Sequence, residues 1–151
     1  MRSGNPWSGE SSSIRWDAPP EGVTWLHVCD RAADDYEVYC RALRQGCDWV
    51  IRACRLNRII HTANAHKTTL EEHLAAQSLS RIQTLEVPAT SKHGPRTALL
   101  HLRYAAVQMP QPRITNTWIR EHAPAEPPPI WVVELEEFDP PEGVEPIRWC
   151  C

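Results

Sequence analysis

The chain has 151 residues, a length suited to a single domain that buries roughly 70% of the surface its unfolded form exposes. Its formal net charge of −3 gives no overall nucleic-acid signature, and the sequence holds no run of roughly 18 apolar residues that could span a membrane. The first residues lack the apolar core of a secretory signal, so we expect a cytoplasmic protein whose six cysteines are reduced.

The first predicted elements form a β-α-β unit over residues 25–53. Residues 25–29 are a short apolar strand, and residues 49–51 are apolar and partly β-branched, which is typical of a second strand. The helix between them has one apolar stripe at helical spacing, formed by Tyr36, Tyr39, Cys40 and Leu43. Gly46 can end this helix in the left-handed conformation. Two strands joined by a single helix predict a parallel pair.

Asp30 follows the first strand directly and is the leading candidate for a site residue. Strands of α/β enzymes end at the crevice where ligands bind, and the rigid backbone there can hold a carboxylate against a metal ion. The other interpretation is a carboxylate that caps the following helix. The parallel pair places Asp30 at the end of one strand and Arg52 at the corresponding end of its neighbour.

The second half of the chain predicts a mostly antiparallel sheet. Capping-box spacing over residues 68–71 opens a short helix with apolar residues Leu70 and Leu74. Apolar positions of period two then predict three strands, through Leu85 and Val87, through Leu100, Leu102 and Tyr104, and through Trp131, Val133 and Leu135. The proline-rich connection over residues 110–129 is expected to be irregular and mobile.

The third of these strands carries a prediction about its two faces. Alternation places Trp131, Val133 and Leu135 on one side and Glu134 and Glu136 on the other. The apolar side is expected to face the core. Large aromatic side chains dominate core energetics, so Trp25 and Trp49 are also interpreted as core residues.

Charge is unevenly distributed along the chain. Residues 41–58 hold five arginines and one aspartate, whereas residues 121–145 hold eight acids and no lysine or arginine. The basic segment can contact phosphates, or it can be a solvated helix face followed by a polar loop. The charges alone leave both interpretations open.

Two motifs resemble a known family. Residues 28–34 read Val-Cys-Asp-Arg-Ala-Ala-Asp and residues 46–53 read Gly-Cys-Asp-Trp-Val-Ile-Arg-Ala. About 110 residues after Asp30, residues 139–149 read Asp-Pro-Pro-Glu-Gly-Val-Glu-Pro-Ile-Arg-Trp. In this order the two motifs resemble bacterial DDE transposases of the IS-four and Tn-five-like group, in the region of their second catalytic aspartate and of a Pro-Pro-x-Gly-x-x-Pro-(Ile/Leu)-x-Trp stretch.

The resemblance implies DNA transposition by metal-dependent phosphodiester chemistry, with Asp30 as a catalytic Mg²⁺ ligand. Arg52 matches a family arginine that faces DNA, and Arg55 and Arg58 extend the same basic segment toward phosphates. Trp149 matches a family tryptophan near a flipped-out base of the transposon end. A solvated Arg52 and a structural Trp149 remain equally open.

The resemblance also implies an organisation. Residues 1–24 are an irregular segment, residues 25–56 are part of an RNase-H-like core, residues 57–144 are a β-rich insertion, and residues 145–151 are a truncated return strand. Ala32 stands where the family usually has glutamate. The family's first aspartate belongs upstream of Asp30 and its glutamate beyond Trp149, so this chain supplies one carboxylate of three.

The sequence therefore predicts a truncated transposase fragment that is inactive alone and does not bind Mg²⁺ tightly. Its expected partners are transposon-end DNA and a second copy or a full-length transposase, at the bacterial nucleoid when bound to DNA. The alternative is a small non-catalytic α+β module whose acidic, proline-rich C-terminal half binds a protein.

Overall fold

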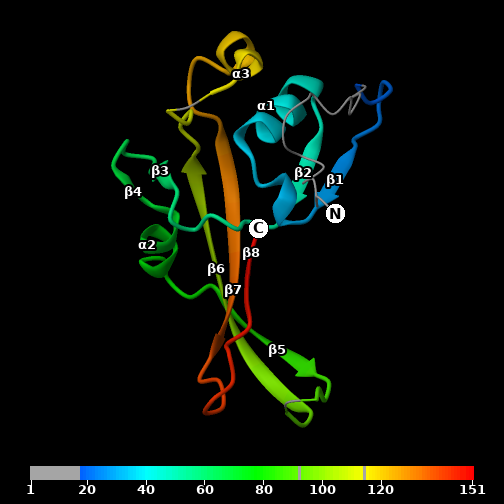
Figure 1. Ribbon diagram of the computed structural model, residues 1–151, viewed down its shortest axis with the longest axis vertical. Coiled ribbons are helices and arrows are strands. Elements are labelled where there is room, and N and C mark those ends of the chain that lie inside the picture. The colour runs from blue at the N-terminus through cyan, green and yellow to red at the C-terminus, as the bar shows by residue number, and fades with distance from the viewer. Residues whose placement is uncertain (1–17, 92, 114) are drawn as a thin grey trace, which may run out of the picture.

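The computed structural model describes residues 18–91, 93–113 and 115–151. Its strands are β1 (Leu26–Cys29), β2 (Asp48–Ile51), β3 (Ile59–His61), β4 (Lys67–Thr69), β5 (Arg81–Val87), β6 (Arg96–Gln108), β7 (Pro129–Phe138) and β8 (Arg148–Cys150). Its helices are the 3-10 helix η1 (Arg31–Ala33), α1 (Tyr36–Gln45), α2 (Leu70–Ala75) and α3 (Thr117–His122). The fold is mixed α/β with mostly antiparallel strands, as the sequence predicts (Figure 1).

The predicted β-α-β unit is present. β1 and β2 pair in parallel as a two-stranded sheet, and α1 connects them. Asp35 caps α1 by accepting a hydrogen bond from the Glu37 backbone, and Gly46 ends it with φ of 67°. Tyr36, Tyr39 and Cys40 of the predicted stripe are buried, but Leu43 is exposed and Ala42 is buried in its place.

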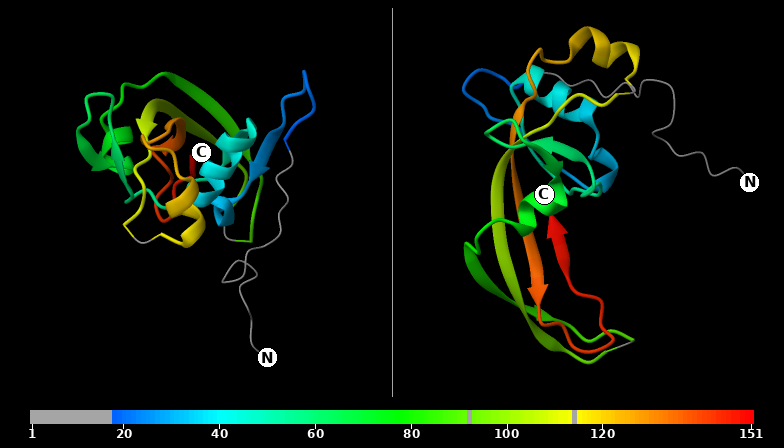
Figure 2. Two further views of the ribbon diagram at one scale, coloured as in Figure 1. Left: turned by 90° about the horizontal axis from the view of Figure 1, so that it is seen from above. Right: turned by 90° about the vertical axis from the view of Figure 1, so that its left-hand side faces the viewer.

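The larger sheet runs in the order β4-β3-β6-β7-β8, and β5 pairs with the lower half of β6. In Figure 2, the helices lie on one side of the long strands β6 and β7, whose lower halves extend away from the helices with β5. One core joins both halves of the chain. Its buried members are Tyr36, Tyr39, Cys40, Ile51, Ile60, Leu70, Leu74, Ala105, Val107, Met109, Ile119, Val132 and Cys150.

The prediction of which face of β7 is buried is wrong for residues 131–134. Trp131 is 68% exposed and Val133 is also exposed, whereas Glu134 is only 1% exposed and Val132 lies in the core. Glu134 can be buried because Arg148 binds it at 2.9 Å and Arg103 lies 3.5 Å away. Alternation identifies two different faces, but the arginines decide which one is inside.

The other tryptophans placed in the core differ from each other. Trp25 is 37% exposed, so its core assignment is wrong. Trp49 is partly buried and packs against the core, with its ring 6.1 Å from that of Tyr39. The strand predicted over residues 25–29 begins one residue later than expected, at Leu26.

The connection over residues 110–129 is not irregular throughout, because it contains α3. Asn116 caps this helix by accepting a hydrogen bond from the Ile119 backbone at 2.8 Å, and Ile119 enters the core. The guanidinium of Arg41 lies 4.0 Å over the Trp118 ring and attaches α3 to α1.

The predicted short helix is α2, and its capping box lies one residue later than the predicted spacing. Thr69 and Glu72 exchange the two hydrogen bonds of the box. The sequence did not predict the β3–β4 hairpin, which precedes α2 and pairs Ile59 with Thr69.

The predicted irregular N-terminal segment lies mostly outside the described residues, which begin at residue 18. At the other end of the chain, β8 pairs with β7 as an antiparallel return strand. Within the part of the chain that the structure describes, no helix is long and apolar enough to cross a membrane.

Candidate nucleic-acid interface

Asp30 and Arg52 lie at the same end of the parallel pair. Cys29 and Ile51, the last residues of β1 and β2, are register partners. The backbone N–H of Arg52 donates to the carbonyl of Cys29 at 3.1 Å, which continues the ladder by one residue. The two predicted site residues therefore emerge side by side, because parallel strands end at a common edge of their sheet.

The Asp30 side chain is exposed and caps the 3-10 helix. Its Oδ1 accepts a hydrogen bond from the Ala32 backbone at 2.9 Å. The capping role that the sequence left open is thus present. Capping uses one carboxylate oxygen, so it does not by itself prevent Asp30 from meeting a cation at the sheet edge.

Asp34, four residues later, is buried and has a different environment. Its carboxylate accepts hydrogen bonds from the Tyr39 hydroxyl and from the backbone N–H groups of Cys54 at 2.7 Å and Arg55 at 3.2 Å. It also forms an ion pair with Arg58. Burial favours the neutral acid, but these bonds and the Arg58 charge outweigh it and lower the pKa of Asp34.

This cluster fixes the loop after β2 against the loop after β1. Arg58 is turned inward, with its side chain 14% exposed, and also donates to the carbonyl of Asp34 at 3.3 Å. Arg58 therefore does not join Arg52 at the surface. The backbone of Arg55 is tied to Asp34, while the residue itself is exposed.

Arg52 meets Trp149, which comes from the distant C-terminal strand. The Arg52 guanidinium carbon lies 4.7 Å from the centre of the Trp149 ring, within the range of a cation–π contact. The backbone supports this juxtaposition, since the Ala53 N–H donates to the Cys150 carbonyl at 2.8 Å. Two of the residues selected from the sequence are thus brought together.

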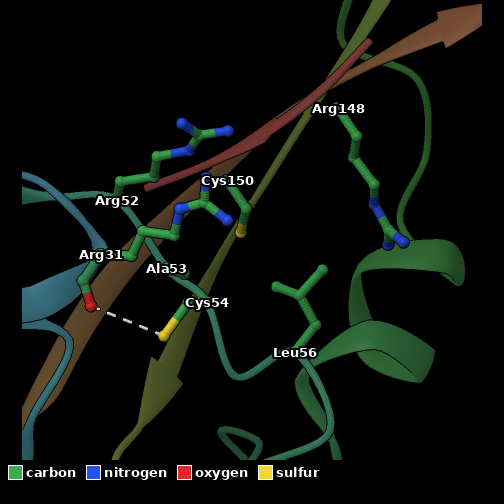
Figure 3. Close-up of a pocket in the computed structure, with 7 residues that line it drawn as sticks. All are labelled: Arg31, Arg52, Ala53, Cys54, Leu56, Arg148 and Cys150. Carbon is green, nitrogen blue, oxygen red and sulfur yellow. Dashed lines mark hydrogen bonds between the residues drawn. The ribbon is translucent and has the colours of Figure 1, made fainter. Parts of the chain in front are cut away.

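A shallow hollow of about 190 Å³ opens beside this contact (Figure 3). It is lined by Arg31, Arg52, Ala53, Cys54, Leu56, Arg148 and Cys150. Arg148 turns away toward α2 and binds Glu71 of that helix and Glu134 of β7. Arg31 and Arg52 consequently provide the positive charge of the hollow. Arg31 was not selected from the sequence, although its position directly after Asp30 was a usable signal.

The two thiols of the hollow are protonated at neutral pH. Burial raises the pKa of Cys150 to about 12, and nearby Glu134 acts in the same direction. Burial also raises the pKa of Cys54, together with its contact with Asp34. A neutral thiol is a poor nucleophile and a poor metal ligand, so the arginines dominate the chemistry of the hollow.

Comparison with protein-family models and with curated proteins finds no match for this chain.

Proposed function

We propose that this chain is a transposase-related DNA-binding protein, in which residues 25–56 are part of an RNase-H-like core and residues 57–144 are its β-rich insertion. The observation that carries the proposal is that Asp30 and Arg52 follow β1 and β2 at the same end of the parallel pair and that Arg52 contacts Trp149. The resemblance implies the aspartate and the arginine at corresponding ends of neighbouring strands, and a tryptophan close to the bound DNA. The observed register supports the first expectation, and the 4.7 Å contact between Arg52 and Trp149 puts the tryptophan beside the proposed phosphate ligand.

The proposed role of the hollow is to hold DNA phosphates. Arg31 and Arg52 line it, and Arg55 is exposed on the same loop. A guanidinium binds phosphate oxygens through two parallel hydrogen bonds. Arg58 has an internal role in this proposal, because its guanidinium neutralises Asp34.

The described residues do not fit a two-metal Mg²⁺ centre. Asp30 offers one exposed carboxylate, while the oxygens of Asp34 are already bound by Tyr39, Cys54, Arg55 and Arg58. No group of three potential ligands occurs among residues 18–91, 93–113 and 115–151. Magnesium prefers several hard oxygen ligands, so we propose that the chain alone holds it weakly and acts on DNA by binding.

The alternative, a module that binds a protein through its acidic C-terminal half, has less support. Three of the eight acids of residues 121–145 are bound internally: Arg148 and Arg103 pair with Glu134, Arg103 with Glu136, and Arg96 with Glu137. These acids balance arginines of the same sheet. The other five acids are exposed, so the charge that this segment presents to a basic partner is reduced from eight acids to five: Glu121, Glu126, Asp139, Glu142 and Glu145.

The test is a titration of the intact chain with hairpin DNA at low and moderate salt, using Arg52→Ala and Arg44→Ala. Arg44 is exposed and lies on α1, away from the hollow. Loss of one phosphate contact weakens binding and lowers the magnitude of the log–log salt slope by about 1. We expect this for Arg52→Ala only. Equal effects of both variants would indicate diffuse attraction and contradict a phosphate site in the hollow.

A further inference from the structure

The long strands have one face that no helix covers. On this face the register aligns Leu102, Leu135 and Trp149 in one row across β6, β7 and β8. The next two rows, toward the end of β6 and the start of β7, align Tyr104 with Val133 and Ala106 with Trp131. Directly opposite residues of antiparallel strands project to the same side, so all of these side chains share one face.

Three aromatic side chains on this face are open to solvent. Tyr104 is 49% exposed, Trp131 is 68% exposed and Trp149 is 53% exposed. The rings of Tyr104 and Trp131 lie 5.9 Å apart. Figure 2 shows the helices on the opposite side of the strands. We call Tyr104, Trp131 and Trp149, with Val133 between them, the aromatic face.

The charges around the aromatic face are positive. Arg52 lies over the Trp149 ring, and Arg81 of β5 is exposed and opposes Leu102 on the same side. Among the described strand residues that project to this side, Glu137 is the one with a carboxylate. Arg96 binds this carboxylate in a bidentate pair. On these strands a ligand meets aromatic rings and guanidinium groups, while the exposed carboxylate of Asp30 lies beside Arg52 at the end of β1.

We propose that the aromatic face binds single-stranded nucleic acid, with unpaired bases stacked on Tyr104, Trp131 and Trp149 and phosphates held by Arg52 and Arg81. Base–aromatic stacking tolerates any sequence, and arginines beside the rings follow the backbone. A duplex keeps its bases stacked on one another, so it cannot use the rings in this way. A protein partner needs no flanking cations, and the charge complementarity therefore favours the nucleic acid.

This inference deepens the proposed DNA-binding function by naming unpaired strands as the ligand. It shares Arg52 and Trp149 with that function and adds Tyr104, Trp131 and Arg81. Tyr104 and Trp131 do not line the hollow, which Arg31 and Arg52 share with the end of β1. Duplex binding and single-strand binding can therefore be lost separately.

The experiment measures binding of the intact chain to a thymidine oligonucleotide of about 15 residues and to the matching duplex, by tryptophan quenching and anisotropy. The variants are Tyr104→Ala, Trp131→Ala and Trp131→Phe. Phe138→Ala is the control, because Phe138 is also exposed but projects from the other side, where it stacks on His101. Circular dichroism verifies that each variant is folded.

We expect Tyr104→Ala and Trp131→Ala to weaken oligonucleotide binding about tenfold each, since one stacked base is lost. Trp131→Phe and Phe138→Ala should bind like the wild type, and duplex binding should be unchanged in all four. Wild-type affinity for the oligonucleotide in Tyr104→Ala and Trp131→Ala would overturn the inference. So would sedimentation showing a dimer that Trp131→Ala dissociates without affecting oligonucleotide binding. Arg52→Ala should weaken both duplex and oligonucleotide binding, because Arg52 lies at both surfaces, and loss of duplex binding alone would contradict its role on the aromatic face.

Discussion

Replacement of Asp34 by asparagine tests whether this buried carboxylate holds the two strand-end loops together. The carboxylate accepts hydrogen bonds from Tyr39, Cys54 and Arg55 and neutralises Arg58. Asparagine keeps the shape and one carbonyl oxygen, but it removes the charge and an acceptor. The variant leaves a largely buried guanidinium without its counter-ion.

The expected loss follows from that geometry. Removing one partner of a buried ion pair destabilises a protein by roughly 3–5 kcal/mol. Arg58 is 14% exposed, so water recovers part of this, and we expect the free energy of unfolding to fall by about 3 kcal/mol. That is a large share of the roughly 5–15 kcal/mol that stabilises a typical protein. With a urea m-value of about 2 kcal/mol per M, the midpoint should fall by about 1.5 M.

Asp30→Asn is the matched control, because it is the same substitution at an exposed carboxylate four residues away. Asparagine also caps helices well, so we expect the free energy of unfolding to change by less than about 0.5 kcal/mol. Urea denaturation followed by circular dichroism measures both variants. Equal midpoints for Asp34→Asn and Asp30→Asn would refute the claim that Asp34 fixes the two loops.

The pKa of Asp34 is lowered on folding from 3.8, so its contribution to stability is fully present above that pH and is lost as the pH falls through the folded pKa; acid titrations should therefore destabilise the wild type more steeply than Asp34→Asn. With Mg²⁺ or Mn²⁺ and transposon-end DNA, the purified chain should show no strand cleavage or transfer, and cleavage abolished by Asp30→Ala would reveal further metal ligands. A neutral quencher acting on single-tryptophan variants should reach Trp149 more readily than Trp49, and a well-shielded Trp149 would contradict its exposure at 53%.

The sequence predicted the β1-α1-β2 unit because each part had a local signal. The apolar stripe and Gly46 determined α1, and the short strands on either side could pair in parallel once α1 connected them. The predicted positions of Asp30 and Arg52, at the ends of β1 and β2, followed from that unit. This part of the candidate site needed no knowledge of distant contacts.

Other features depended on contacts between distant residues. Trp131 is exposed and Glu134 is buried because Arg148 and Arg103 bind the glutamate, and alternation along one strand carries no sign of these partners. α3 was missed because prolines surround its short sequence, although Asn116 offered a capping signal. The structural role of Asp34 depends on Arg58, which lies 24 residues later in the chain and pairs with it.

The most direct measurement is a ¹H–¹⁵N NMR titration of the intact chain with hairpin DNA at low salt. We expect the largest shifts at the amides of residues 29–31 and 52–55 and at the indole of Trp149, where Arg31 and Arg52 line the hollow. These shifts should reverse when salt is added, as phosphate contacts predict. Shifts confined to α1 and α3, or none at this end of β1 and β2, would contradict a DNA interface there.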